Sequence, residues 1–571
     1  MPSQQSRREF IVRLASVSAV MTAGASLSSC GGDPQPEFNY GVASGDPLAD
    51  RVILWTHAKF AGSDSTVNLV YEVASDASFS QVVTRGSATA TPETGHTVKV
   101  DASGLKPGTA YYFRFLHDST PSPVGMTRTL PQAASSLKLA VLSCSNYPTG
   151  FFNVYAEVAK SDAEFAIHLG DYIYEYDAKG YASSSAASLG RLSVPANELF
   201  SISDYRARHA QYKSDPDSKN LHARVPMIAV WDDHEIANDA YNGGAENHTE
   251  ATEGAWTARK QAALQAYHEW MPIRTGADKG TIYRRFDFGS LVSLHMLDTR
   301  LIGRDKQIDI TDLAGAKGPS AQASASAAFS SPTRQMLGTT QLSWLQNGLA
   351  TSTATWQVLG QQVLMARMEF PVSILTALNT TDTSAAAQAA GQQAITDYLT
   401  AKNTPPAART PVQTALLNPV SNPLLGYNLD AWDGYLAARE TILGTVASLR
   451  KRLVVLAGDT HNAWHSDLTL KGLANPATAG VKVGEEFATP SVSSPGLEAY
   501  LATLQPAQIK GIFESVVEDL NWMDASRRGY LKMTFTTTAA KGEWVFIDRI
   551  DSRGYSASIG HTATYSPGAL S

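Results

Sequence analysis

The sequence predicts an α/β protein whose core domain follows a smaller all-β domain. Residues 38 to about 130 read as short alternating strands separated by turn residues, whereas from about residue 137 apolar strands alternate with helical stretches. In addition, five apolar runs of the second region each end in oxygen, sulfur or imidazole side chains. Open α/β sheets carry their sites at the carboxyl ends of strands, so we expect these side chains at one rim.

The first region, residues 38–130, is predicted to be a small β-sandwich. Three of its segments alternate apolar and polar residues and read as strands, namely 51–55, 67–73 and 96–100. Residues 105–114 resemble the fibronectin-type-III or immunoglobulin-like pattern, in which a tyrosine, here Tyr111, folds back on the turn before a core strand. We expect this domain to support the core, because its sequence carries no candidate catalytic group.

Residues 1–30 read as an export signal. Residues 6–11, which include Arg7 and Arg8, form a twin-arginine motif, and a weakly apolar stretch follows it. Cleavage after Ala25 would release a soluble protein, whereas residues 27–30 resemble a lipobox that would lipidate Cys30. We therefore expect a protein exported by the twin-arginine pathway, which is periplasmic, extracellular or lipid-anchored and has no membrane span.

Charge and cysteine content narrow the function. The formal net charge is −7, and no Lys/Arg cluster is interleaved with aromatic residues, which argues against stable nucleic-acid binding. The chain has two cysteines, Cys30 and Cys144. In an exported protein Cys144 would have no disulfide partner, so it is either a small buried hydrophobic residue or a metal ligand.

The core domain is predicted over residues 137–560, with weakly patterned inserts near 180–195, 310–335 and 370–425. Its buried strands are read at residues 137–142, 165–169, 227–231, 291–296 and 453–457. Amphipathic helices are expected at 255–270 and 340–350. Residues 530–535 and 543–548 read as a hairpin that closes one sheet.

Candidate ligands follow the five strands. They are Cys144 and Asn146, Asp171 and Tyr174, Asp232, Asp233 and His234, Asp298, and Asp459 and His461, and Arg300, which follows Asp298, is a candidate phosphate contact. Asp171 and Tyr174 can face one metal from a single turn, and Asp459 and His461 would point to one side in an extended chain. Because a thiolate argues against Mg²⁺ and Ca²⁺ and a phenolate needs a strongly acidic cation, the set Cys, Tyr and Asp suggests Fe³⁺.

Two of these segments resemble elements of metallophosphoesterases. Residues 458–461 are similar to their Gly-His-Thr-His element, with aspartate in place of the first histidine, and residues 232–235 to their Gly-Asn-His-Asp/Glu element. With the motifs at residues 38–47, 53–56, 432–435, 489–491 and 494–496, the chain resembles the PhoD-type alkaline phosphatases of the calcineurin-like superfamily. The resemblance implies a calcineurin-like metallophosphoesterase β-sandwich core flanked by helices.

The resemblance also implies a mixed Fe³⁺/Ca²⁺ centre. Iron would be held by Cys144, Asp171, Tyr174 and His461, and Asp171 would bridge to calcium, which Asp233 and Asp459 would also bind. His234, Asp233 and Arg300 would be catalytic, and Asn146, Asp232 and Asn238 would contact phosphate or support the ligands. The family often continues Asp-Thr-Arg with Tyr-Arg; here three other residues precede Arg304, so the substrate-side wall would differ. Without the resemblance, the residues are also compatible with a site that holds only zinc, only manganese or only calcium.

The implied function is that of a secreted, metal-dependent alkaline phosphatase. It would hydrolyse phosphomonoesters, and in a wider reading phosphodiesters, by attack of a hydroxide formed at the metal pair. A phospholipase D-like or nucleotide phosphodiesterase activity on the same fold is the alternative. A surface binding protein with a degenerate domain is a further alternative, but every motif position here holds a competent ligand. The natural substrate and the oligomeric state stay open.

Overall fold

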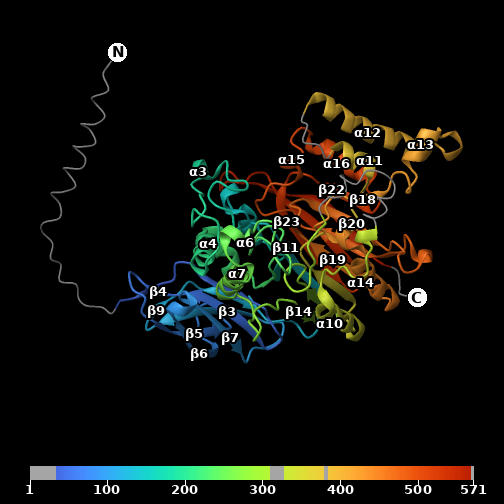
Figure 1. Cartoon of the computed structure of the whole chain (residues 1–571). Coiled ribbons are helices and arrows are strands. Elements are labelled where there is room, and N and C mark those ends of the chain that lie inside the picture. The colour runs from blue at the N-terminus through green and yellow to red at the C-terminus, as the bar shows by residue number, and fades with distance from the viewer. Residues whose placement is uncertain (1–33, 309–326, 379–383, 568–571) are drawn as a thin grey trace, which may run out of the picture.

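The computed structural model describes residues 34–308, 327–378 and 384–567 (Figure 1). The twin-arginine motif, Cys30 with both candidate processing sites, and most of the predicted insert near 310–335 lie outside these residues. Within the described ranges, none of the helices combines the length and the apolar character needed to cross a membrane.

The N-terminal region folds into a sandwich of two sheets. One sheet contains β10 (Gly125–Arg128), β8 (Ala110–His117), β5 (Val67–Ala74), β6 (Val82–Ala90) and β9 (Thr120–Pro121). The other contains β2 (Val42–Gly45), β3 (Arg51–His57) and β7 (Thr97–Ser103), and β1 (Pro36–Glu37) pairs separately with β4 (Lys59–Phe60). The Tyr111 hydroxyl accepts a hydrogen bond from the Lys106 amide at 2.9 Å, so this tyrosine folds back on the preceding turn as predicted.

The core consists of two large sheets. The first has the order β25 (Ala557–Tyr565), β24 (Ala540–Ile547), β23 (Arg528–Thr536), β11 (Ser136–Leu142), β12 (Phe165–His168) and β13 (Met227–Ala229), and continues into β2, β3 and β7. The second has the order β14 (Arg284–Phe288), β15 (Val292–Met296), β16 (Trp356–Gly360), β19 (Leu453–Ala457), β21 (Lys482–Ala488), β20 (Ala463–Thr469) and β22 (Leu520–Asp524). Helices flank the two sheets, which is the sandwich core that the sequence predicts (Figure 1).

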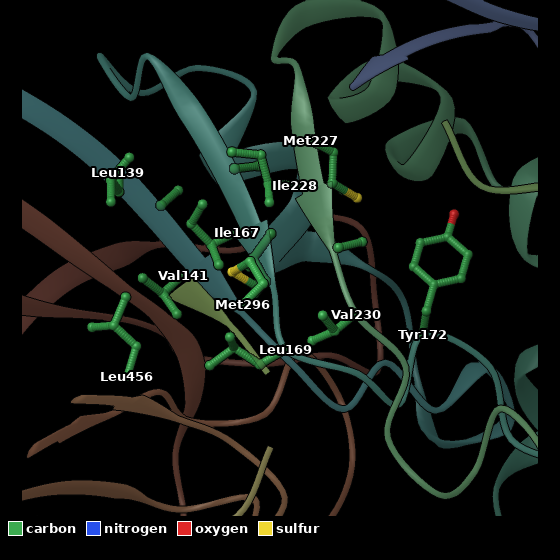
Figure 2. Packing of buried hydrophobic residues seen from close by; sticks show 14 of the residues in the cluster. Leu139, Val141, Ile167, Leu169, Tyr172, Met227, Ile228, Val230, Met296 and Leu456 are labelled. Carbon is green, nitrogen blue, oxygen red and sulfur yellow. The ribbon is translucent and has the colours of Figure 1, made fainter. Parts of the chain in front are cut away.

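Apolar side chains fill the space between the two sheets. Val141 and Ile167 of the first sheet lie beside Met296 and Leu456 of the second, and all four are fully buried (Figure 2). Their strands read as continuous apolar runs because strands of parallel sheets are covered on both faces. The apolar runs of the sequence therefore predict the limits of β11, β12, β15 and β19 to within about one residue.

The two predicted domains share a sheet, which the sequence did not indicate. Strand β2 pairs in parallel with β13, with Gly45 opposite Met227. A side chain at Gly45 would have its Cβ 2.3 Å from the carbonyl oxygens of Met227 and Pro272, so only glycine fits this junction. The indole nitrogen of Trp55 also donates to the Glu269 carbonyl at 2.8 Å. These contacts fix the N-terminal sandwich to the core.

The predicted helices and hairpin are present with shifted limits. The helices are α7 (Trp256–Trp270) and α10 (Gly338–Thr351), and β23 pairs with β24 as a hairpin. The hairpin does not close its sheet, because β25 adds one further strand beyond β24. Other helices that cover the core are α2 (Asn153–Val158), α4 (Ile202–Ser214), α5 (Pro216–Arg224) and α14 (Leu436–Ser448), whereas α6 (Glu250–Glu253) buries none of its residues.

The insert over residues 370–425 is largely helical. It contains β17 (Glu369–Pro371), α11 (Val372–Leu378), α12 (Ala385–Asn403), α13 (Pro411–Leu416) and β18 (Leu424–Gly426). Figure 1 shows α12 and α13 projecting from the body of the molecule, as expected for a surface excursion. The sequence reading missed these helices because α12 is rich in alanine, which favours helix without producing an apolar stripe.

Candidate metal centre

The predicted ligands meet at one rim of the sandwich. Strands β11, β12 and β13 are parallel to one another, as are β15, β16 and β19, so the carboxyl ends within each set lie at one edge. Ligand-type atoms lie within 4.8 Å of one another in three groups, which are Cys144 with Asp171 and His461, Asp171 with Asp233 and His234, and Asp232 with Asp233 and Asp459. Asp171 and Asp233 each belong to two groups, so the ligands form one continuous cluster.

Tyr174 joins the first of these groups. Its hydroxyl donates to Asp171 Oδ2 at 2.9 Å and lies 3.2 Å from His461 Nε2. Ser494 Oγ is 2.6 Å from the same hydroxyl and itself donates to the Cys144 carbonyl oxygen, so it anchors the phenol from behind. The sequence identifies the motif around Ser494, but no feature of that segment predicts the contact with Tyr174.

The imidazole of His461 is held in the tautomer that a metal ligand needs. Its Nδ1 lies 2.6 Å from the Pro495 carbonyl oxygen, which can only accept, so Nδ1 carries the proton. The lone pair of Nε2 then points toward Tyr174 and Asp171. Cys144 lies on the other side of this group, fully buried, with its sulfur 3.2 Å from Ser143 Oγ.

Four of the predicted ligands lie in the left-handed region of the backbone. The φ angles are 62° at Cys144, 55° at Asp171, and 63° at both Asp459 and His461. The expectation that Asp459 and His461 share an extended segment is therefore wrong; they lie in a turn after β19. Non-glycine residues in this region cost of order 1–3 kcal/mol each and cluster where function over-determines the backbone.

Arg300 is completely buried behind the carboxylates. Its Nε donates to Asp232 at 2.5 Å, Nη1 to Asp430 at 2.7 Å and Nη2 to Asp459 at 3.0 Å. The structure thus places Arg300 among the ligands and away from the open cavity. Arg304 also donates hydrogen bonds to Asp430. The unusual spacing between the two arginines therefore affects the hydrogen bonds behind the ligands and not the wall of the cavity.

Several carboxylate oxygens of the cluster are buried without a hydrogen-bond partner. These atoms are Asp171 Oδ1, Asp232 Oδ2 and Asp233 Oδ1. Burial, reinforced by the neighbouring carboxylates, raises the pKa of both Asp232 and Asp459 well above the ordinary range of aspartate. Orphaned anionic oxygens on crowded carboxylates are what a cation site requires, so the donor set fits bound metal.

The thiol and the phenol complete this donor set. Burial first, and the charge of Asp171 next, raise the pKa of both Cys144 and Tyr174 well above their ordinary values. In the absence of a cation both groups therefore keep their protons. A strongly acidic cation at this position would displace these two protons and would then be bound by one thiolate and one phenolate.

His234 is oriented by a carboxylate that the sequence reading missed. Its Nδ1 lies 2.7 Å from Glu175 Oε2, and Glu175 Oε1 accepts from the Asn238 amide and from Asn247 Nδ2, each at 2.8 Å. The imidazole also lies against the ring of Tyr174, with centroids 4.2 Å apart. Glu175 directly follows Tyr174, and that adjacency to a ligand was its only signal in the sequence.

The protonation of His234 follows from these neighbours. Burial opposes its charge, but Glu175, Asp171 and Asp233 outweigh burial and raise the pKa of the imidazole well above its ordinary value. Cations bound by Asp171 and Asp233 would neutralise the charge of these two carboxylates. Glu175 would then be the main group that raises the pKa of His234. His234 can thus hold a proton on Nδ1 toward Glu175 and offer Nε2 to the cavity.

The two predicted asparagines differ in position. Asn238 lines the cavity in front of the ligands, and its Nδ2 donates to Glu246 at 3.1 Å. Asn146 is buried and does not line that cavity, and neither atom of its amide group has a partner among the described residues. The structure therefore brings Asn238, but not Asn146, to the surface that a bound molecule would touch.

Known proteins that resemble this chain are phosphatases. Residues 139–544 match the family model described as PhoD-like phosphatase, and residues 26–131 match the model of the N-terminal domain of PhoD-like phosphatases. The chain is 34% identical over 513 residues to alkaline phosphatase D of Bacillus subtilis (strain 168), covering 86% of this chain and 76% of that protein. It is also similar to a solved structure titled "Structure of PhoD", with a TM-score of 0.72, 30% identity and coverage of 94% and 92% of the two chains.

Proposed function

The chain belongs to the PhoD-like phosphatase family and is a metal-dependent phosphoric ester hydrolase, and we propose that its metal pair is Fe³⁺ and Ca²⁺ at the rim described above. The observation that carries this proposal is the donor set: a thiol, a phenol, an imidazole and a carboxylate converge in the first group. Sulfur and phenolate donors suit Fe³⁺, whereas the carboxylates of Asp233 and Asp459 suit an oxygen-preferring cation such as Ca²⁺.

The ligands divide between the two cations. Cys144, Tyr174 and His461 would hold iron, Asp233 and Asp459 would hold calcium, and Asp171, which lies in two ligand groups, would serve both. When bound, two adjacent cations neutralise charge on the phosphate oxygens and lower the pKa of a water molecule toward about 7. We propose phosphate monoesters as substrates, with diesters as the alternative.

The protein side chains supply the remaining steps. Glu175 fixes the imidazole of His234 with Nδ1 protonated, which leaves Nε2 on the cavity side. A proton on Nε2 would pass to the leaving oxygen of the ester as its bond to phosphorus breaks. Arg300 acts behind the site, because its three hydrogen-bonded carboxylates include the ligand Asp459.

The metal pair is tested by the spectrum of the protein purified without chelator. We expect a visible charge-transfer band from Tyr174 to Fe³⁺, iron and calcium by elemental analysis, and turnover of nitrophenyl phosphate. Tyr174→Phe is expected to lose the band and most of the activity, because the phenol contacts both Asp171 and His461. Tyr176→Phe is the matched control: this neighbouring tyrosine lines the cavity but has no hydrogen bond to either ligand.

The outcomes separate the parts of the proposal. A colourless protein that turns over the ester would overturn the iron assignment and keep the hydrolase. Loss of the band in Tyr176→Phe as well would remove the assignment to Tyr174. Turnover that survives removal of all metal by a chelator would contradict the metal-dependent mechanism itself.

Replacement of Glu175 by glutamine is expected to lower kcat about 10- to 100-fold for an alkyl phosphate, with a smaller change for nitrophenyl phosphate. The alkoxide of the first ester needs the proton that His234 donates, whereas nitrophenolate leaves without it. Glu250→Gln, which alters an exposed carboxylate outside the cavity lining, is the control. Equal losses for both esters would show that Glu175 supports the fold rather than the proton transfer.

We also propose export by the twin-arginine pathway. The motif at Arg7 and Arg8 supports it. Changing both arginines to lysine is expected to retain the protein in the cytoplasm. Cell fractionation followed by mass spectrometry of the mature N-terminus would also distinguish cleavage after Ala25 from lipidation of Cys30. Unchanged export of the double variant would contradict the assignment.

A further inference from the structure

A cavity of about 500 Å³ opens in front of the ligands and is lined by two unlike surfaces. One end carries polar and ligand-type groups, which include Asp171, Asp233, His234 and Asp459. The lining also contains a group of apolar side chains from one stretch of the chain, namely Leu497, Leu501, Leu504, Ile509, Ile512 and Phe513, which we call the apolar wall. Its volume is in the range of cavities that bind small molecules.

The apolar wall is built by α15 (Leu497–Tyr500), the loop after it and α16 (Pro506–Val516). Ile509, Ile512 and Phe513 follow helical i, i+3 and i+4 spacing, so they share one face of α16. Ile509 and Phe513 are buried, and the Phe513 ring packs edge-on against Phe370 of β17 with centroids 4.9 Å apart. This inner layer fixes the helix in place.

The outer layer of the wall is only partly covered. Leu501, Leu504 and Ile512 are half-buried, although all three line the cavity. Side chains of this type are normally covered by apolar contacts, and here the exposed part faces the space that starts at the metal ligands. Because the cluster of ligands fixes a phosphate at one end, a group bonded to that phosphate is the molecule that can reach this layer.

The chemistry of the wall indicates what that group is. The polar lining residues beside the apolar wall are few. Tyr427 lies with its ring centroid 5.3 Å from that of Phe513, Asn428 follows it in the chain, and Tyr500 precedes Leu501. A sugar or a nucleobase would leave most of its hydrogen-bonding groups unpaired against leucine and isoleucine. An alkyl chain has no such groups and would gain from being removed from water.

We propose that the apolar wall binds the alkyl chain of the substrate, so that the enzyme selects phosphate esters with an apolar alkyl substituent. The inference deepens the proposed function and rests on it, because the phosphate must lie at the metal centre. Each methylene that the wall covers should raise kcat/KM about three- to fourfold. The gain should stop at the chain length at which the wall is filled.

The test is a series of n-alkyl phosphates from ethyl to octyl, used below their micellar concentrations with the metal-loaded enzyme. Released phosphate gives kcat/KM for each monoester, and the released alcohol gives it for the same series as methyl diesters, which covers the second ester class. We expect a rising dependence on chain length in at least one class. The double variant Leu501→Ser/Ile512→Ser is expected to flatten the rise with chain length, and Leu504→Ser alone should reduce it.

Leu473→Ser is the matched control, since this leucine is 41% exposed and lies outside the cavity lining. A flat dependence on chain length in the native enzyme would overturn the proposal while leaving the hydrolase intact. An unchanged rise in the wall variants would also overturn it. If the loaded enzyme hydrolysed no ester of either class, including nitrophenyl phosphate, the proposed function itself would fail, and that result is distinct from a flat series.

Discussion

Replacing Asp171 by asparagine is expected to lower kcat for nitrophenyl phosphate by about a thousandfold, equivalent to about 4 kcal/mol. Asp171 belongs to two ligand groups, with Oδ1 unpartnered and Oδ2 accepting from Tyr174. An amide keeps the size of the side chain but removes the negative charge that two cations would share. Elemental analysis should therefore show a reduced content of both metals, and the visible band should weaken with the iron.

Asp177→Asn gives the matched control, because this exposed aspartate lies six residues further along the same loop and outside the ligand groups. It should keep full activity and both metals. If Asp171→Asn lost only one metal, Asp171 would not serve both cations. Native metal content together with native turnover would remove Asp171 from the centre altogether.

The order of the site along the chain could be predicted because local sequence and long-range structure agree there. Apolar runs such as 165–169 and 453–457 are strands buried on both faces, and parallel strands bring their carboxyl ends to one edge. Asp171 and Asp459 lie two residues after such runs, and His461 lies two residues further on. To predict that these side chains converge, one further needs only the order of the strands in the fold, and the resemblance to a known family supplied that order.

The partners of these ligands could not be predicted in the same way. Arg300 meets Asp430 across 130 positions, and Ser494 meets Tyr174 across 320. Such contacts depend on which way a side chain turns at the rim, and neither spacing nor composition carries that information. The same limit applies to Gly45, whose pairing with Met227 joins the N-terminal sheet to the core.

Arg300→Met is expected to lower the free energy of unfolding of the metal-free protein by about 3–5 kcal/mol. The guanidinium is fully buried and bonds to Asp232, Asp430 and Asp459. Its removal leaves the buried Asp232 and the half-buried Asp459 without their cation, whereas Asp430 keeps Arg304. Methionine fills much of the volume, and the loss therefore reports charge rather than a cavity. Urea unfolding of the metal-free native and variant proteins measures it.

The metal-loaded protein should show a smaller loss, because a cation beside Asp233 and Asp459 would compensate part of the exposed charge. Arg300→Lys should lie between the native protein and Arg300→Met, since lysine restores the charge but cannot bond to three carboxylates in a planar fork. The control Arg527→Met removes a partly exposed pair with Asp524 and should cost less than about 1 kcal/mol. A loss in Arg300→Met no larger than in this control would mean that the carboxylates take up protons freely, and that Arg300 does not hold the ligand cluster together.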